Sequence, residues 1–167
     1  MYATLDDFIF VYYENFRSRA YAQILSENGL FPRKVIKLGD EIAPKFFFRY
    51  PKVSLPYSPT EFNPQVSVAS SFEKFGRNIE TILIDNVNSK EFINVLNKFD
   101  CKYLIYSGRA GVILKDEVLH ACEGVLHVHG GYLPEYRGST TFYYSILDKF
   151  EIGASAIFIN SEIDEGN

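Results

Sequence analysis

The feature that most constrains the fold is the pattern of residues 8–38. Residues 8–13 form an unbroken apolar and aromatic run, FIFVYY, which is typical of a strand buried on both faces. Apolar side chains at helical spacing follow, with Ser18 as the expected N-cap and Gly29 as the expected end. A second apolar strand is predicted over residues 33–38. Strand, helix and strand in this order favour a parallel sheet with right-handed crossovers.

The same alternation continues toward the C-terminus. Further strands are predicted over residues 79–85, 103–107, 124–129 and 154–160. Helices are predicted over 66–75, from Ser89 to Phe99, over 115–120, and from a cap at Ser139 or Thr140 to Leu147. The prediction is therefore an α/β fold, doubly wound around a mostly parallel sheet, with residues 1–167 as a single domain.

Residues 40–64 interrupt this pattern. Five prolines lie in this stretch, so neither a central strand nor a long helix is expected. Its aromatic side chains predict an ordered surface loop held down by ring packing, with a lid or specificity loop as the alternative.

Composition narrows the function classes. The net charge is −4 and no run of Lys and Arg builds a basic stripe, so nucleic acid is not an expected partner. Cys101 and Cys122 form neither a disulfide framework nor a metal-binding pair, which favours a reduced, cytoplasmic protein without a metal site. No apolar run approaches the roughly 20 residues of a membrane span, and no signal peptide is expected.

Two histidines end the apolar strand predicted over residues 124–129. Side chains alternate along a strand, so His127 and His129 share one face while Leu126 and Val128 share the other. Imidazoles suit proton transfer near neutral pH, although a pair of hydrogen-bonded structural histidines fits the spacing equally well.

An aspartate, Asp164, follows the last predicted strand. Ligands of open α/β sheets bind beyond the carboxyl ends of strands, where an aspartate can orient an imidazole. The alternative is a solvated acidic segment, since Glu162 and Glu165 lie beside Asp164.

Residues 100–167 resemble the formyltransferase family that uses 10-formyltetrahydrofolate. The family pattern is Gly-x-Gly-x-Ile-Leu, then Asn-x-His-x-Ser-x-Leu-Pro-x-Tyr/Phe-Arg-Gly, and finally Asp-x-Gly. This chain has G-R-A-G-V-I-L at residues 108–114, H-V-H-G-G-Y-L-P-E-Y-R-G at 127–138 and D-E-G at 164–166. The resemblance implies a Rossmann-like formyltransferase fold, with 10-formyltetrahydrofolate as co-substrate.

Residue by residue, the resemblance makes His129 and Asp164 the active-site histidine and aspartate. It also makes residues 108–114 the loop whose backbone holds the pterin. These loop residues are Gly108, Arg109, Ala110, Gly111, Val112, Ile113 and Leu114. The implied activity is N-formylation of a small amine, expected to be an amino sugar carried on a nucleotide.

Two positions depart from the family. His127 replaces the usual asparagine, which donates to the developing oxyanion, and Gly131 replaces the usual serine. The departures leave open a formyltetrahydrofolate hydrolase or a non-catalytic module that binds folate or a sugar nucleotide. Family members continue beyond the position of Asn167, so the catalytic domain is expected to be incomplete at its C-terminus.

Overall fold

The computed structural model describes residues 3–39, 62–76, 79–109, 111–138 and 140–160. Within these ranges six strands form one sheet: β1 (Ala3–Tyr12), β2 (Leu30–Leu38), β3 (Thr81–Ile84), β4 (Tyr103–Ser107), β5 (Gly124–His129) and β6 (Ser155–Phe158). The helices between them are α1 (Phe16–Glu27), α2 (Val68–Glu73), α3 (Lys90–Lys98), α4 (Asp116–Leu119) and α5 (Thr141–Lys149).

The sheet has the strand order β3-β2-β1-β4-β5-β6, and its first five strands are parallel. The order reverses between β1 and β4, which is where ligands of doubly wound folds bind. The predicted α/β architecture is confirmed. β6 runs antiparallel to β5, with His129 opposite Ser155 and Leu126 opposite Phe158.

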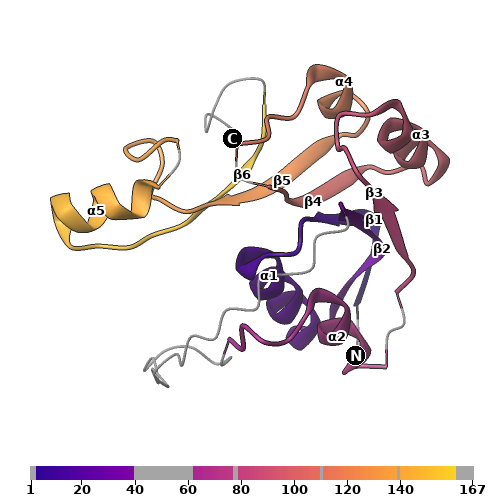
Figure 1. Cartoon of the computed structure of the whole chain (residues 1–167), viewed down its shortest axis with the longest axis horizontal. Coiled ribbons are helices and arrows are strands. Elements are labelled where there is room, and N and C mark those ends of the chain that lie inside the picture. The colour runs from indigo at the N-terminus through magenta and orange to yellow at the C-terminus, as the bar shows by residue number, and fades with distance from the viewer. Residues whose placement is uncertain (1–2, 40–61, 77–78, 110, 139, 161–167) are drawn as a thin grey trace.

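Helices cover both faces of the sheet, and each face has its own apolar cluster (Figure 1). On one face, Phe92 and Leu96 of α3 and Val118 of α4 pack against the strands. On the other, Ala22 of α1 and Phe72 of α2 pack against Phe10 and its neighbours. Burial on both faces explains why the β1 sequence lacks polar alternation.

Helix α1 begins earlier than predicted. Asn15 is its N-cap, because the Asn15 side chain accepts a hydrogen bond from the Ser18 backbone N–H at 2.9 Å. Ser18, the predicted cap, lies inside the helix, and its hydroxyl bonds outside it, to the Tyr13 carbonyl at 2.7 Å. Ser89, where a helix was predicted to begin, caps α3.

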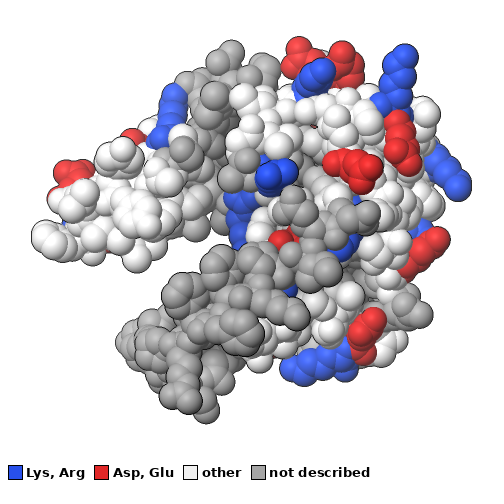
Figure 2. All heavy atoms as spheres, in the orientation of Figure 1, with Lys and Arg blue, Asp and Glu red and all other residues white. Residues whose placement is uncertain are grey.

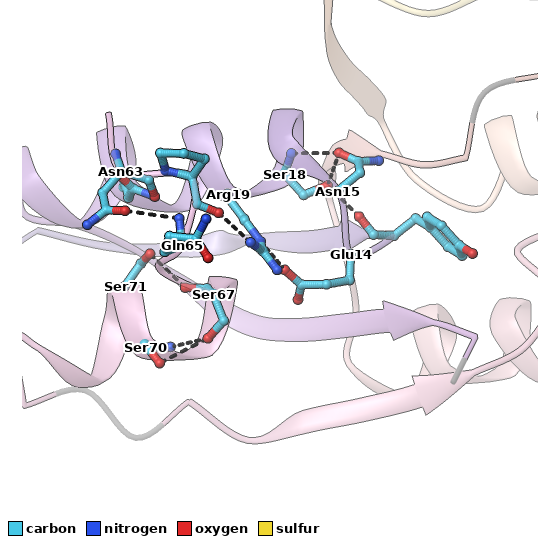
Figure 3. Close-up of polar contacts among 12 residues, drawn as sticks. Glu14, Asn15, Ser18, Arg19, Asn63, Gln65, Ser67, Ser70 and Ser71 are labelled. Atoms are coloured by element: carbon cyan, nitrogen blue, oxygen red, sulfur yellow. Dashed lines mark hydrogen bonds and ion pairs between the residues drawn. The ribbon is translucent and has the colours of Figure 1, made fainter. Parts of the chain in front are cut away.

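Residues 40–61, which contain most of the predicted loop, lie outside the described residues. The segment that follows is held to α1 by polar contacts (Figure 3). Gln23 and Asn63 exchange two hydrogen bonds of 2.8 and 2.9 Å. Arg19 donates to the Pro64 carbonyl and forms a 2.8 Å ion pair with Glu14, in which both side chains are about 10% exposed.

Helix α5 differs from the other helices in what it buries. Its buried residues are Thr141 and Ser145, whereas Leu147 is 79% exposed and the following Phe150 is 90% exposed. The helix projects from the body of the molecule (Figure 1), and its surface is largely uncharged (Figure 2). Thr140 precedes it in a left-handed conformation (φ 61°) without a side-chain cap, and Ser139 lies outside the described residues. Among the described helices none is long and apolar enough to cross a membrane.

Candidate active site

Strand β5 carries the two histidines toward the edge of the sheet where the parallel strands end. Val125 packs in the cluster beneath α3 and α4, so the alternation of β5 puts His127 and His129 on that same face. Leu126 packs against the opposite cluster. The arrangement predicted for the two histidines is therefore the one observed.

Each imidazole has one nitrogen held by a backbone carbonyl. His127 is half-buried, and its Nδ1 lies 3.0 Å from the carbonyl oxygen of Tyr106 on β4. His129 is 6% exposed, and its Nε2 lies 2.7 Å from the carbonyl oxygen of Tyr136. A carbonyl oxygen can only accept, so in both contacts the ring nitrogen is the donor.

The loop that carries Tyr136 is itself fixed at several points. The Tyr136 hydroxyl donates to Asp148 of α5 at 2.7 Å, and this bond raises the pKa of Tyr136 to about 12. The Ser155 hydroxyl of β6 donates to the Gly131 carbonyl at 2.8 Å and accepts from the Leu133 N–H at 3.0 Å. The carbonyl that meets His129 is thus held between α5 and β6.

Asp164 lies outside the described residues, so its pairing with His129 is not tested. The topological argument for that pairing was that both residues follow strand ends at one edge of a parallel sheet. That premise is wrong, because β6 is antiparallel and its last residue, Phe158, lies beside Leu126 rather than beyond His129.

The predicted folate loop begins at the end of β4. Gly108 is buried, and a Cβ at this position would lie 2.0 Å from the Tyr106 hydroxyl, so only glycine fits there. Gly111 has φ 79°, a conformation that favours glycine. Arg109, Val112, Ile113 and Leu114 are described, whereas Ala110 is not.

Arg109 and Val112 line a cavity of about 240 Å³ at the ends of β1 to β4. Tyr13 and Tyr106 contribute aromatic walls, and the Arg109 guanidinium lies 5.7 Å from the centroid of the Tyr13 ring. Burial raises the pKa of Tyr106 to about 12, and its hydroxyl has no hydrogen-bond partner among the described residues. The predicted loop therefore adjoins a cavity with aromatic and basic walls.

A polar cluster at the reversal of the strand order was not predicted from the sequence. The Ser18 and Ser107 hydroxyls lie 2.8 Å apart, and both side chains are fully buried. Arg17 donates to the Gly108 carbonyl at 2.7 Å and to the Ser107 hydroxyl at 3.2 Å. The start of α1 is thereby bonded to the start of the predicted folate loop. The sequence pointed to this cluster only through two serines that lie close to predicted strand ends.

Both cysteines are free thiols. Burial raises the pKa of Cys101 to about 12 and also raises that of Cys122. Within the described residues no cluster of three or more His, Cys, Asp or Glu side chains could hold a metal ion.

Comparisons with known proteins agree with the motifs. No family model matches the chain. It is 30% identical over 92 residues to the methionyl-tRNA formyltransferase of Finegoldia magna, and 35% identical over 85 residues to that of Buchnera aphidicola. These matches cover 53% and 50% of this chain but only 29% and 27% of the two relatives.

Solved formyltransferase structures share the fold. The phosphoribosylglycinamide formyltransferase of Campylobacter jejuni superposes with a TM-score of 0.61 and 14% identity, over 99% of this chain and 78% of that one. A sugar N-formyltransferase from a Shewanella species superposes with a TM-score of 0.50 and 16% identity, over 95% of this chain and 53% of that one. This chain is thus similar to formyltransferases in sequence over about half its length and in fold over nearly all of it.

Proposed function

We propose that this protein is an N-formyltransferase, with residues 1–167 forming a catalytic domain that moves a formyl group from 10-formyltetrahydrofolate to a small amine. The observation that carries the proposal is the placement of His127 and His129 at the end of β5. His127 contacts Tyr106 of β4, and the loop that follows β4 lines the cavity. Tyr106 links the two features, because its carbonyl accepts from His127 and its side chain lines the cavity. Histidines suit proton transfer, and a glycine-containing loop suits a flat ligand.

For the acceptor we propose an amino sugar carried on a nucleotide. The curated relatives are named for a tRNA substrate, but the net charge here is −4, and Lys and Arg are interspersed with Asp and Glu (Figure 2). A tRNA ligand would favour a continuous basic surface. One structural neighbour is named a sugar N-formyltransferase.

In the proposed reaction the acceptor amine attacks the formyl carbon, and the carbonyl oxygen becomes an oxyanion. A proton then leaves the amine and reaches N10 of the folate, the bond between the formyl carbon and N10 breaks, and tetrahydrofolate departs. His129 would transfer that proton, with Asp164 proposed to stabilise the imidazolium that forms. The loop of residues 108–114 would hold the pterin through its backbone.

By the resemblance, His127 would take the place of the asparagine that donates to the oxyanion. Because Nδ1 of His127 donates to the Tyr106 carbonyl, its Nε2 carries a lone pair in the neutral ring. His127 could therefore donate to the oxyanion through Nε2 only as an imidazolium. Asparagine, the usual residue, donates without a change of charge.

The test supplies 10-formyltetrahydrofolate with and without nucleotide-linked amino sugars. Turnover that requires the amine supports the proposal, and His127→Ala should then lower turnover by about 10²–10³, whereas His127→Asn should retain most of it. Release of formate without an amine would instead indicate the hydrolase. Folate binding without turnover would indicate the non-catalytic module.

A further inference from the structure

The surroundings of the two imidazoles carry an inference that deepens the proposed function and rests on it for its catalytic meaning. We infer that the backbone holds the two histidines in opposite neutral tautomers, His127 with its proton on Nδ1 and His129 with its proton on Nε2. In the neutral rings the lone pair then lies on Nε2 of His127 and on Nδ1 of His129. Gly131 and Thr141 act as positioning residues for His129.

For His127 a single hydrogen bond determines the tautomer. Its Nδ1 lies 3.0 Å from the Tyr106 carbonyl oxygen, which has no proton to give. The hydrogen bond made by one ring nitrogen determines which nitrogen of a neutral imidazole carries the proton. Nδ1 therefore keeps the proton. This is the tautomer that an unconstrained histidine side chain populates less.

For His129 two acceptors converge on the same nitrogen. The Tyr136 carbonyl oxygen lies 2.7 Å from Nε2, and the Thr141 hydroxyl oxygen lies 3.5 Å from it. The Thr141 hydroxyl donates its single proton to the Gly130 carbonyl at 2.7 Å, so toward His129 it presents only lone pairs. The Tyr136 carbonyl and the Thr141 hydroxyl both accept, and Nε2 is therefore the protonated nitrogen.

Gly131 makes this arrangement possible. A Cβ at residue 131 would lie 2.9 Å from the Thr141 hydroxyl oxygen, 3.0 Å from the Tyr136 carbonyl oxygen and 3.2 Å from Nε2 of His129. These three atoms are the ones that define the tautomer. The glycine that replaces the usual serine thus makes room for the two acceptors around His129.

The inference is tested by nitrogen-15 NMR of the imidazoles in the full chain, at a pH where the rings are neutral. His120, His127 and His129 are the three histidines, and single His→Gln variants assign their signals. The expected spectrum shows His127 protonated on Nδ1 and His129 protonated on Nε2. Identical tautomers for the two residues, or averaging between tautomers in either, would overturn the inference.

Matched variants test the positioning residues. Gly131→Ala should convert His129 to mixed tautomers, whereas Gly130→Ala should not, because a Cβ at residue 130 meets nothing within 4 Å. Thr141→Val should weaken the preference of His129, and Thr141→Ser, which keeps the hydroxyl, should preserve it. An unaltered His129 spectrum in a folded Gly131→Ala protein would refute the positioning role.

Activity provides a separate measurement. Gly131→Ala should lower kcat, by about 10-fold if misplacing the ring costs about 1.4 kcal/mol, with little change in KM for 10-formyltetrahydrofolate. Opposite tautomers in a protein without formyl transfer would refute the proposed function and leave the tautomer assignment standing. Formyl transfer by a protein whose two histidines have the same tautomer would refute the tautomer assignment and leave the proposed function standing.

Discussion

Removing the Tyr106 hydroxyl should stabilise the protein. This side chain is 5% exposed, and its hydroxyl is buried without a hydrogen-bond partner among the described residues. An unsatisfied buried polar group costs about 1–3 kcal/mol, and Tyr106→Phe removes it while keeping the ring in place. With a small allowance for the void left by the oxygen, we expect the free energy of unfolding at pH 7 to rise by about 1 kcal/mol.

The same substitution should change the response to alkali. Burial raises the pKa of Tyr106 from 10.0 to about 12 in the folded protein, so from pH 10 upward the unfolded chain loses this proton first. The resulting stability is fully present below pH 10 and is lost as the pH rises to about 12. Two pH units at about 1.4 kcal/mol each give a loss of about 3 kcal/mol that Tyr106→Phe should escape.

Urea unfolding of both proteins between pH 7 and pH 11.5 measures these two effects. Tyr144→Phe is the control, because Tyr144 is 64% exposed and its hydroxyl is solvated. The difference between parent and Tyr106→Phe should widen above pH 10. A Tyr106→Phe protein less stable than the parent at pH 7 would show that the hydroxyl is satisfied, and the reasoning would fail.

Three further predictions concern the contacts around the site. Gly108→Ala should destabilise the fold by about 1–3 kcal/mol in urea unfolding, because its Cβ would lie 2.0 Å from the Tyr106 hydroxyl. Arg17→Met should raise KM for 10-formyltetrahydrofolate more than it lowers kcat in steady-state assays, since it removes the bond to the Gly108 carbonyl; an unchanged KM would separate this contact from folate binding. Arg19→Met should destabilise the protein by about 3 kcal/mol, because it leaves Glu14 nearly buried without its partner, and the double variant Arg19→Met/Glu14→Gln should recover part of that loss.

Most helices and strands of this fold could be predicted from the sequence because residue types that favour turns or caps lie at their ends. β4 and β5 have the predicted bounds of residues 103–107 and 124–129, and glycines adjoin both strands. The α1 boundary was missed because both Asn15 and Ser18 are good caps, and the Ser18 hydroxyl instead lies 2.8 Å from the Ser107 hydroxyl at the end of β4. Which of the two residues caps α1 depends on a contact with β4, about ninety residues away in the sequence. The local sequence pattern carries no information about such a contact.

The candidate site was predictable in its side chains but not in its backbone partners. The spacing of His127 and His129 on a strand requires a shared face, and this follows from alternation alone. The carbonyls that accept from the two histidines belong to Tyr106 and Tyr136. Every residue type has a backbone carbonyl, so the residue types at these positions do not predict the contacts. The direction of β6 could not be predicted either, because a short apolar strand has the same sequence pattern whether it runs parallel or antiparallel to its neighbour.

The way α5 projects from the sheet has a consequence for hydrogen exchange. Its apolar side chains face outward, so little buried area opposes the opening of its backbone hydrogen bonds. The Tyr13 amide, in contrast, donates to the Ser107 carbonyl at 2.9 Å beside the buried serine pair, in the middle of the sheet. Amides of α5 should therefore exchange through local opening while those at the junction of β1 and β4 exchange only through global unfolding. Since the Tyr136 hydroxyl is bonded to Asp148 of α5, local opening of this helix should be coupled to the loop that holds His129.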